Sequence, residues 1–407
     1  MAQSTGRYIV IFTQFYPPEA AAASNRVSAV ARALADSGDH VTVVTGAPSF
    51  PAGVIPPEYR VRRRGEERDG EVRVHRVWTY ASPRLRTIDR LLNWLSVAFG
   101  ASLYAMMRRE RIDIALVSSP PITLALPGLT ARLFRRAELV VDIRDVYPDV
   151  AIKLGVWKRS GAIARAVGAV ADLVYRRASL ILTVTETCRG EILSRGVPPE
   201  KVVTAPNGFD RIDLPATAPL ERGAGDFIVA YAGNFGVATG MDVLLDAALR
   251  LRPQKQYRFV LVGGGADGDG VARRVMDDRL DNVRLLGPQP RAIAAAVMRG
   301  ADVCVVPLRR GLVDSLPTKL IDSLSVGTPV IVCAQGEARE FVERSGGGVA
   351  VDPEDGAALA AAISTLAADA SRRERLAHDG REFVTRHYGR AAVVADISRR
   401  IAALVVP

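Results

Sequence analysis

Short apolar runs rich in β-branched residues alternate with helical patterns along the whole sequence, and this alternation constrains the fold more than any other feature. In the first half these runs predict buried parallel strands at Tyr8–Phe12, Val41–Thr45, Ile114–Ser118, Leu139–Ile143 and Leu180–Val184. Helical patterns between them lie at Asn25–Ala35, Ile88–Arg109 and Ile163–Ala178. Strands that alternate with helices in this way predict a doubly wound α/β sheet.

The same pattern starts again after a polar, proline-rich passage, Asn207–Asp226. Strands are predicted at Phe227–Ala232, Phe259–Val262, Val283–Leu286, Val303–Val306, Val330–Cys333 and Val349–Val351. Helices are predicted at Met241–Leu251, Arg291–Arg299, Thr318–Val326 and Gly356–Ala368. We therefore expect two Rossmann-like domains, residues 1–207 and 227–380, joined by a linker at 208–226. Residues 381–407 are expected to form a C-terminal helix that could cross back to the first domain. Ligands of such sheets bind at the carboxyl ends of the strands, so we expect a cleft there.

Composition narrows the class of protein. The chain has 407 residues, of which 48% are hydrophobic and 24% charged, which excludes a disordered or fibrous chain. The start has no long apolar region followed by a cleavage site, so we expect a cytoplasmic protein. Three widely spaced cysteines and four scattered histidines predict neither a disulfide framework nor a metal site.

The net charge of +10 is unevenly distributed. Residues 1–207 contain 29 Lys and Arg against 19 Asp and Glu, whereas residues 208–407 contain 25 of each. The basic half is expected to face a phosphate-bearing or membrane-surface partner rather than nucleic acid, although a solvated basic face is the alternative. Within it, Leu91–Met107 is almost uncharged and is short for a membrane span. It is either a buried helix that covers the sheet or a helix whose apolar face meets a membrane surface. The flanking arginines are Arg84, Arg86, Arg90, Arg108, Arg109 and Arg111.

Two segments of the second half could hold a nucleotide. Gly233, Gly236 and Gly240 lie between a predicted strand and helix, where glycines let the backbone approach a diphosphate at a helix N-terminus. A second glycine turn, Gly263–Gly265, is a weaker signal of the same kind. Such turns also occur for packing alone, and neither of them has the GxGxxG spacing of dinucleotide sites.

The second segment, DSLPTKLIDSLSVGTPVIV, combines two carboxylates with a lysine. Pro317 is expected at the first helical position, so that Asp314 lies in the loop before the helix and Asp322 about one turn inside it. Lys319 lies three residues before Asp322 on the same face. One carboxylate could bind sugar hydroxyls and the other a ribose, while the lysine and the helix N-terminus hold a diphosphate. A surface helix with an ordinary Lys–Asp pair is the alternative.

The order of these features resembles the retaining glycosyltransferases of family 4, which have the GT-B fold of two such domains. The resemblance covers nearly the full chain, through TQFYPPEAAAASNRV, LTVTETCRGEILSRGVPPEKVVTAPNGFD, AGNFGVATGMDVLLDA and LPTKLIDSLSVGTPVI. The variants DIRDVYPD, GNFG and PTK are similar to transferases that build bacterial surface polysaccharides on lipid carriers.

By this resemblance, the Glu-x7-Glu motif of the family falls on Asp314 and Asp322, so that Asp314 would contact the donor sugar and Asp322 the ribose. Many members carry an arginine and a lysine for the diphosphate where this chain has Asn234 and Thr239. Lys319 is therefore the expected replacement, with Arg309 and Arg310 as the other available cations. The expected donor-binding set is Gly233, Asn234, Phe235, Gly236, Thr239, Gly263, Gly287, Leu316, Pro317, Thr318 and Asp322.

In the first domain, the histidine and acid of the family align with Arg144 and Asp145. Arginine stays protonated and cannot be a general base, but it can place a positive charge beside a phosphate or the acceptor. Its alternative role is an ion pair with a neighbouring aspartate, for which Asp142, Asp145 and Asp149 are available. The expected catalytic set is Asp314, Arg144, Asp145 and Lys319, and the expected acceptor side is Pro17, Pro18, Glu19, Ala22, Ala23 and Ser24.

The resemblance implies metal-independent, retaining transfer of a hexosyl or N-acetylhexosaminyl group from a nucleotide sugar, expected to be UDP-linked, with no cofactor. The acceptor would be a polyprenyl-diphosphate-linked glycan, and the enzyme would lie peripherally on the inner face of the plasma membrane. Alternatives are a soluble natural-product acceptor, a sugar-nucleotide 2-epimerase, a dinucleotide-dependent oxidoreductase and a sugar-nucleotide binding module without activity.

Overall fold

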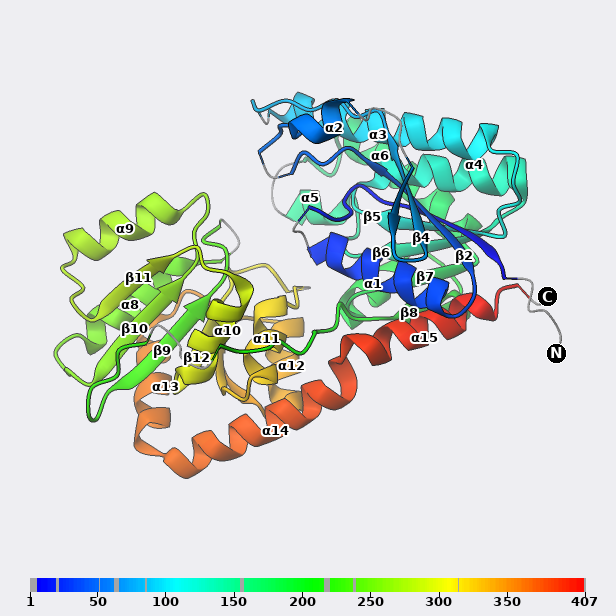
Figure 1. The fold of residues 1–407 in the computed structure, drawn as a ribbon. Helices are drawn as coiled ribbons and strands as arrows, with labels where there is room; N and C mark the ends of the chain where they lie inside the picture. The colour runs from blue at the N-terminus through cyan, green and yellow to red at the C-terminus, as the bar shows by residue number, and fades with distance from the viewer. Residues whose placement is uncertain are drawn as a thin grey trace. The chain divides into compact units, whose positions relative to one another are not determined.

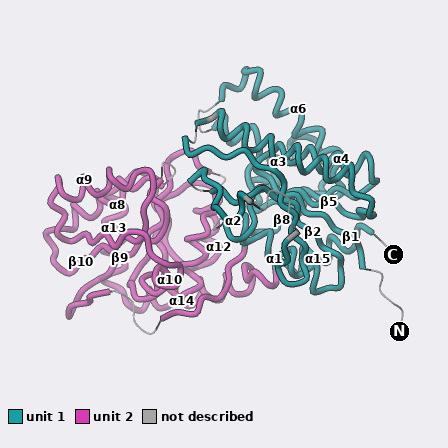
Figure 2. Tube along the Cα trace, turned by 45° about the horizontal axis from the view of Figure 1, so that its top comes forward, with its two compact units in different colours: residues 1–207, 393–407 teal, residues 208–392 magenta. Residues whose placement is uncertain are grey.

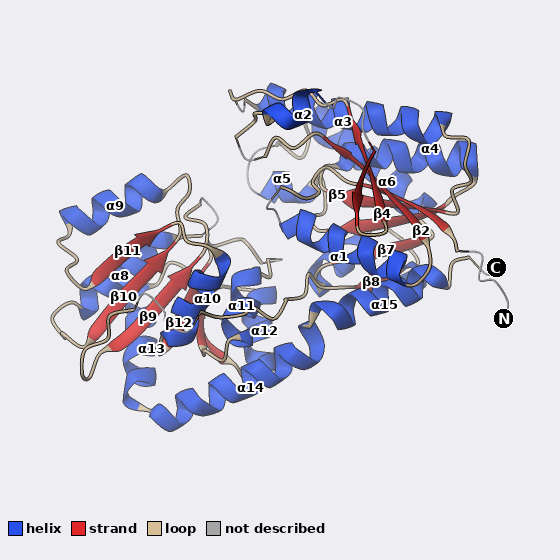
Figure 3. Ribbon diagram, in the orientation of Figure 1, coloured by secondary structure: helices blue, strands red, loops and turns tan. Residues whose placement is uncertain are grey.

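The protein divides into two compact α/β units. The computed structural model describes residues 6–19, 22–50, 52–61, 66–84, 86–153, 157–215, 220–236, 239–313 and 315–405. Unit 1 comprises residues 1–207 and 393–407, and unit 2 comprises residues 208–392 (Figure 2). In each unit, helices cover a central sheet (Figure 3).

Unit 1 contains an eight-stranded sheet with the order β3-β4-β2-β1-β5-β6-β7-β8. Every pair is parallel except β3 with β4. The strands are β1 Tyr8–Phe12, β2 His40–Gly46, β3 Glu66–Asp69, β4 Val72–Val77, β5 Ile114–Ser119, β6 Glu138–Ile143, β7 Leu180–Thr183 and β8 Val202–Thr204. The strand order reverses between β1 and β5, and ligands of such sheets bind at this kind of position.

Helices cover both faces of the unit 1 sheet, and each face has its own apolar core. Val97 and Ala101 of α3 pack with Val10 and Phe12 on one face, where α4 and α6 also lie (Figure 1). The other face packs against α1 and against α15, the last helix of the chain. The helices and 3₁₀ turns are α1 Ala22–Asp36, α2 Pro57–Val61, α3 Thr87–Met107, η1 Ile122–Leu124, α4 Ala125–Arg135, α5 Asp149–Lys153, α6 Ala162–Arg177, α7 Glu186–Leu193, η2 Pro199–Lys201 and α15 Arg390–Ala402.

Unit 2 contains a six-stranded, fully parallel sheet with the order β11-β10-β9-β12-β13-β14. The strands are β9 Phe227–Ala232, β10 Tyr257–Val262, β11 Val283–Gly287, β12 Val303–Pro307, β13 Val330–Cys333 and β14 Gly348–Val351. The helices are α8 Met241–Leu251, α9 Gly268–Asp277, α10 Arg291–Gly300, α11 Thr318–Ser325, α12 Glu337–Ser345, α13 Gly356–Ala368 and α14 Ala370–Tyr388. The predicted class, two doubly wound parallel sheets, is confirmed.

The chain passes between the two units at two points, and these two segments are hydrogen bonded to each other. The amide of Phe209 donates to the carbonyl of Tyr388 at 2.9 Å, and the amide of Arg390 donates to the carbonyl of Phe209 at 2.9 Å. Gly208 has φ +69°, and a Cβ there would lie 2.9 Å from the Cα of Arg390, so glycine permits this close approach. Beyond these contacts, Val393, Ile397 and Ile401 are buried in the core of unit 1.

Candidate active site

A pocket of about 320 Å³ lies at the carboxyl edge of the unit 2 sheet. The turn after β9 contributes Gly233 and Asn234, the turn after β10 contributes Gly263 and Gly264, and α11 contributes Lys319 and Asp322. The sheet order reverses between β9 and β12, so the pocket is beside the switch point where doubly wound sheets bind ligands. The remaining lining residues are Ile212, Ala232, Val262, Pro288, Gln289, Arg291, Ala294 and Met298.

The two glycine turns pack against each other through their backbones. Gly233 has φ +154° and Gly263 has φ +142°, conformations that favour glycine. A Cβ on Gly263 would lie 1.8 Å from the carbonyl oxygen of Gly233. Because the turns carry no side chains at this contact, they approach closely and leave room for a ligand above them.

Neutral groups hold the first turn in place. The hydroxyl of Tyr231 donates to the carbonyl oxygen of Asn234 at 2.7 Å, and Thr239 Oγ1 donates to the same oxygen at 3.0 Å. The amide of Gly236 donates to Thr239 Oγ1 at 3.4 Å. Phe235 is buried against the ring of Tyr231, with 5.6 Å between centroids, so it is a core residue. Thr239 and Phe235 therefore stabilise the turn and are absent from the pocket lining, and their expected contact with the donor stays a prediction.

Lys319 supplies a positive charge to the pocket from the first turn of α11. Its Nζ donates to the hydroxyl of Tyr231 at 2.6 Å and lies 4.5 Å from the centroid of that ring. Burial lowers the pKa of Lys319 to about 8. Among the described residues, no carboxylate forms an ion pair with it. A largely buried ammonium group beside a helix N-terminus, without a carboxylate partner, is suited to binding an anion.

Asp322 reaches the same pocket but pairs with a residue that the sequence did not reveal. Arg291 Nη2 lies 3.4 Å from Asp322 Oδ1, and Arg291 Nη1 lies 3.7 Å from Asp210 Oδ2. Burial raises the pKa of Asp322, and the charge of Arg291 partly offsets this rise. The Lys–Asp pair considered as an alternative is therefore absent, since Lys319 contacts Tyr231 and Asp322 contacts Arg291. Neither Tyr231 nor Arg291 belongs to a recognisable motif, so no sequence signal identified them.

The other expected donor residues lie near the pocket without lining it. Pro317 has φ −65° and ψ 135°, so it precedes α11 as its N-cap residue, one position earlier than predicted, and Thr318 begins the helix. Leu316 packs against the core of unit 2. Gly287 ends β11, and its carbonyl accepts the amide of Gly263 at 2.9 Å. Asp314 lies outside the described residues, so its expected contact with the donor sugar stays a prediction.

Arg144 lies at the carboxyl end of β6 in unit 1 and is held by backbone carbonyls. Its Nη2 donates to the carbonyl of Pro120 at 2.9 Å, and its Nη1 is buried without a hydrogen-bond partner among the described residues. Asp142 instead forms a buried ion pair with Arg26, at 2.8 Å. The Arg144–Asp142 ion pair considered from the sequence is therefore absent. Burial lowers the pKa of Arg144, while the charges of Asp142 and Asp145 oppose that shift. Asp145 itself is exposed.

The expected acceptor loop is ordered by Glu19. Its Oε1 accepts the amides of Ser49 at 2.9 Å and of Phe50 at 3.0 Å, so this carboxylate joins the loop after β1 to the loop after β2. Burial raises the pKa of Glu19, and the two amides partly offset the rise. Pro17 and Pro18 precede it, Ala22 and Ala23 begin α1, and Ser24 is buried in the first turn. A role in acceptor binding stays a prediction for this loop.

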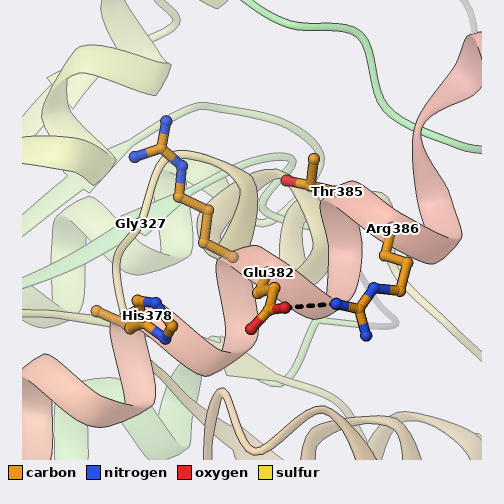
Figure 4. A pocket seen from close by; sticks show the side chains of 7 residues that line it. Gly327, His378, Glu382, Thr385 and Arg386 are labelled. Carbon is orange, nitrogen blue, oxygen red and sulfur yellow. Dashed lines mark hydrogen bonds and ion pairs between the residues drawn. The ribbon is translucent and has the colours of Figure 1, made fainter.

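A second hollow of unit 2, about 540 Å³, lies along α14 and contains none of the expected site residues. In Figure 4, Glu382 and Arg386 form an ion pair along one side of it, with His378 and Gly327 nearby. This hollow lies along one helix, away from the glycine turns after β9 and β10, so the pocket beside Lys319 is the better candidate for a nucleotide.

Comparison with known families identifies the class of protein. Residues 22–208, in unit 1, match the glycosyl transferase 4-like domain, and residues 226–369, in unit 2, match the glycosyl transferases group 1. The chain is therefore a glycosyltransferase, and its two parallel-sheet units give it the GT-B fold.

Its relatives are glycosyltransferases, some named for colanic acid biosynthesis and others as D-inositol 3-phosphate glycosyltransferases. The chain is 26% identical over 373 residues to WcaI, a colanic acid biosynthesis glycosyl transferase of Escherichia coli K12, covering 87% of this chain and 91% of WcaI. Among solved structures, sucrose-phosphate synthase from Thermosynechococcus elongatus has a TM-score of 0.74 at 20% identity, with 98% and 99% of the chains covered. HepE of Anabaena in complex with UDP has a TM-score of 0.71 at 17% identity, with 97% and 100% covered.

Proposed function

We propose that the protein is a retaining glycosyltransferase of family 4 that transfers a sugar from a UDP-sugar to a lipid-linked glycan of cell-surface polysaccharide synthesis. The observation that carries the donor assignment is Lys319, a largely buried ammonium group without a carboxylate partner among the described residues, in a pocket with Asp322. The complex of HepE with UDP supports the proposed donor, and the relation to WcaI supports a role in polysaccharide synthesis.

In the proposed donor complex, Lys319 and the N-terminal end of α11 bind the diphosphate. The Asp322 carboxylate accepts hydrogen bonds from the ribose hydroxyls, and Arg291 favours its ionised form. When the bond between the anomeric carbon and the β-phosphate oxygen breaks, negative charge develops on the phosphate. Lys319 stabilises this charge in the transition state, which is the usual source of catalysis in such sites.

The proposed transfer needs neither a metal nor a covalent intermediate. The acceptor oxygen forms its bond to the anomeric carbon on the face that the phosphate leaves, and the acceptor proton passes to the leaving phosphate oxygen. This front-face route follows from the family resemblance, as do the expected contact of Asp314 with the donor sugar and the positive charge that Arg144 places near the reacting groups.

The experiment begins with donor binding and continues with transfer. Purified protein is screened by thermal shift against UDP-, GDP- and dTDP-sugars, because a ligand present at about 100 times its Kd stabilises a protein by about 2.7 kcal/mol. The donor that binds is then incubated with polyprenyl-diphosphate-linked sugars and with soluble sugars. The product is analysed by mass spectrometry, and its anomeric configuration by NMR. A product with inverted configuration, transfer to soluble sugars alone, or donor conversion without an acceptor would contradict the proposal.

A further inference from the structure

Helix α3 is apolar on two faces, which a helix at the surface of a sheet does not need. Val97, Ala98, Ala101 and Ala105 are fully buried and cover the sheet of unit 1. The opposite face carries an exposed apolar stripe, spaced by three, four or seven residues as helix geometry requires. This stripe consists of Ile88, Leu92, Leu95, Phe99 and Met106. The predicted buried helix that covers the sheet describes one face of α3, and contact with a membrane surface stays a prediction for the exposed face.

The neighbouring helix α4 also carries exposed apolar side chains. Helices α3 and α4 pack against each other and lie side by side in Figures 1 and 2. Arg135 of α4 donates to the carbonyl of Ala105 at 3.1 Å, which joins their C-terminal ends. Leu126, Leu133 and Phe134 of α4 are exposed, Leu133 by 73% and Phe134 by 58%. We call the five stripe residues of α3 and these three residues of α4 the α3–α4 face.

Exposed arginines lie at both ends of the α3–α4 face. Arg84 and Arg90 are at the N-terminal end of α3, and Arg109 and Arg136 follow the C-terminal ends of α3 and α4. All four side chains are exposed, and among the described residues none of them forms an ion pair with a carboxylate. These arginines belong to the half of the chain that carries the entire charge excess, 29 basic against 19 acidic residues.

We propose that the α3–α4 face docks on the surface of an anionic lipid bilayer, with its leucines and phenylalanines among the acyl chains and its arginines at the phosphates. Exposed apolar side chains gathered on two packed helices mark an interaction site, and basic groups beside them match anionic headgroups. A second copy of the chain fits less well, because a two-fold contact would bring the same arginines together. Among the described residues, no helix is long and apolar enough to cross a bilayer, so the contact is peripheral.

This proposal goes beyond the proposed transfer reaction, since it is carried by the α3–α4 face and not by the donor pocket. Its test is co-sedimentation with vesicles of phosphatidylcholine alone or with phosphatidylglycerol, at low and high salt. We expect wild-type protein to sediment with the anionic vesicles at low salt. We expect at least tenfold weaker binding at about 1 M salt, where the Debye length falls to about 3 Å.

Two variants separate the apolar and the basic contributions. The triple variant Leu92→Ser, Leu95→Ser, Phe99→Ser removes the central three of the five stripe residues. The quadruple variant Arg84→Ser, Arg90→Ser, Arg109→Ser, Arg136→Ser removes the arginines at the ends of the face. Each should weaken vesicle binding tenfold or more and leave UDP affinity unchanged. The control for the apolar variant is Met276→Ser, since Met276 is an exposed residue of α9 in unit 2. The control for the arginine variant is Arg250→Ser with Arg273→Ser, since both arginines are exposed in unit 2.

The outcomes that overturn the proposal differ from those that overturn the donor assignment. Wild-type protein that stays in the supernatant with anionic vesicles, or variants that sediment as wild type does, would refute lipid docking even if UDP binds. A dimer in light scattering that the triple variant dissociates would assign the α3–α4 face to a second copy. A Phe99→Trp variant adds a second readout: quenching by brominated acyl chains beyond that of wild type, which contains Trp78, Trp94 and Trp157, requires that residue 99 enters the bilayer.

Discussion

The charge of Lys319 should make the affinity for UDP depend on pH in a way that uridine does not share. Burial lowers the pKa of this lysine to about 8, so about nine tenths of the molecules carry the charge at pH 7 and about one tenth at pH 9. A bound diphosphate stabilises the charged form, so affinity falls as the pH rises through 8. We expect the Kd for UDP to rise roughly tenfold between pH 7 and pH 9. The terminal phosphate of UDP, with a pKa of about 6, is ionised throughout this range.

The assay is isothermal titration calorimetry with UDP and uridine at pH 7, 8 and 9. Lys319→Ala should lose a charge-assisted hydrogen bond, about 1.5 to 3 kcal/mol, and bind UDP about 10 to 150 times more weakly at pH 7. Lys319→Arg keeps its charge at pH 9, so its UDP affinity should be nearly flat with pH. The reasoning is refuted if wild type shows no pH dependence, or if uridine affinity follows the same curve.

Three further outcomes are expected. Asp322→Ala should weaken UDP and uridine alike by tenfold or more in calorimetry, because the ribose is common to both, and equal affinity to wild type would remove Asp322 from the site. Tyr231→Phe should lower the pH midpoint of UDP binding, because it removes the hydroxyl that accepts a hydrogen bond from the ammonium group of Lys319 at 2.6 Å and so favours its charged form; an unchanged midpoint would show that this contact does not stabilise the charge. Arg26→Met should lower the free energy of unfolding by about 3 to 5 kcal/mol in urea, because it leaves Asp142 buried without its partner, and Arg26→Met with Asp142→Leu should recover most of this loss.

The sheets were predictable because most of their strands are continuous apolar runs, which is how strands buried on both faces appear in a sequence. The strand β3 was missed for the opposite reason. The sequence of β3 is Glu-Glu-Arg-Asp, at the edge of the sheet, and it pairs antiparallel with β4 across a turn where Gly70 has φ +60°. An edge strand with charged side chains has no apolar pattern to reveal it.

The sequence identified residues of the candidate site only where they lie close together in one segment. Lys319 and Asp322 stood out because they share a segment with Pro317, and the glycine turns stood out because they lie between a strand and a helix. Their partners did not, since Tyr231 precedes Lys319 by 88 residues and Arg291 precedes Asp322 by 31. A spacing of three residues suggested a pair between Lys319 and Asp322, but the packing of three separate segments gave each of them a different neighbour.

The return of α15 to the core of unit 1 sets an order of assembly. Unit 2 is encoded without interruption, so all of its residues are synthesised before the last part of unit 1. Until Val393, Ile397 and Ile401 arrive, one side of the unit 1 core is uncovered, and this side includes Ile9 and Val27 from the beginning of the chain. During synthesis unit 1 is thus the first unit to begin and the last to be completed. Until then its incomplete core exposes apolar side chains of the kind that chaperones protect.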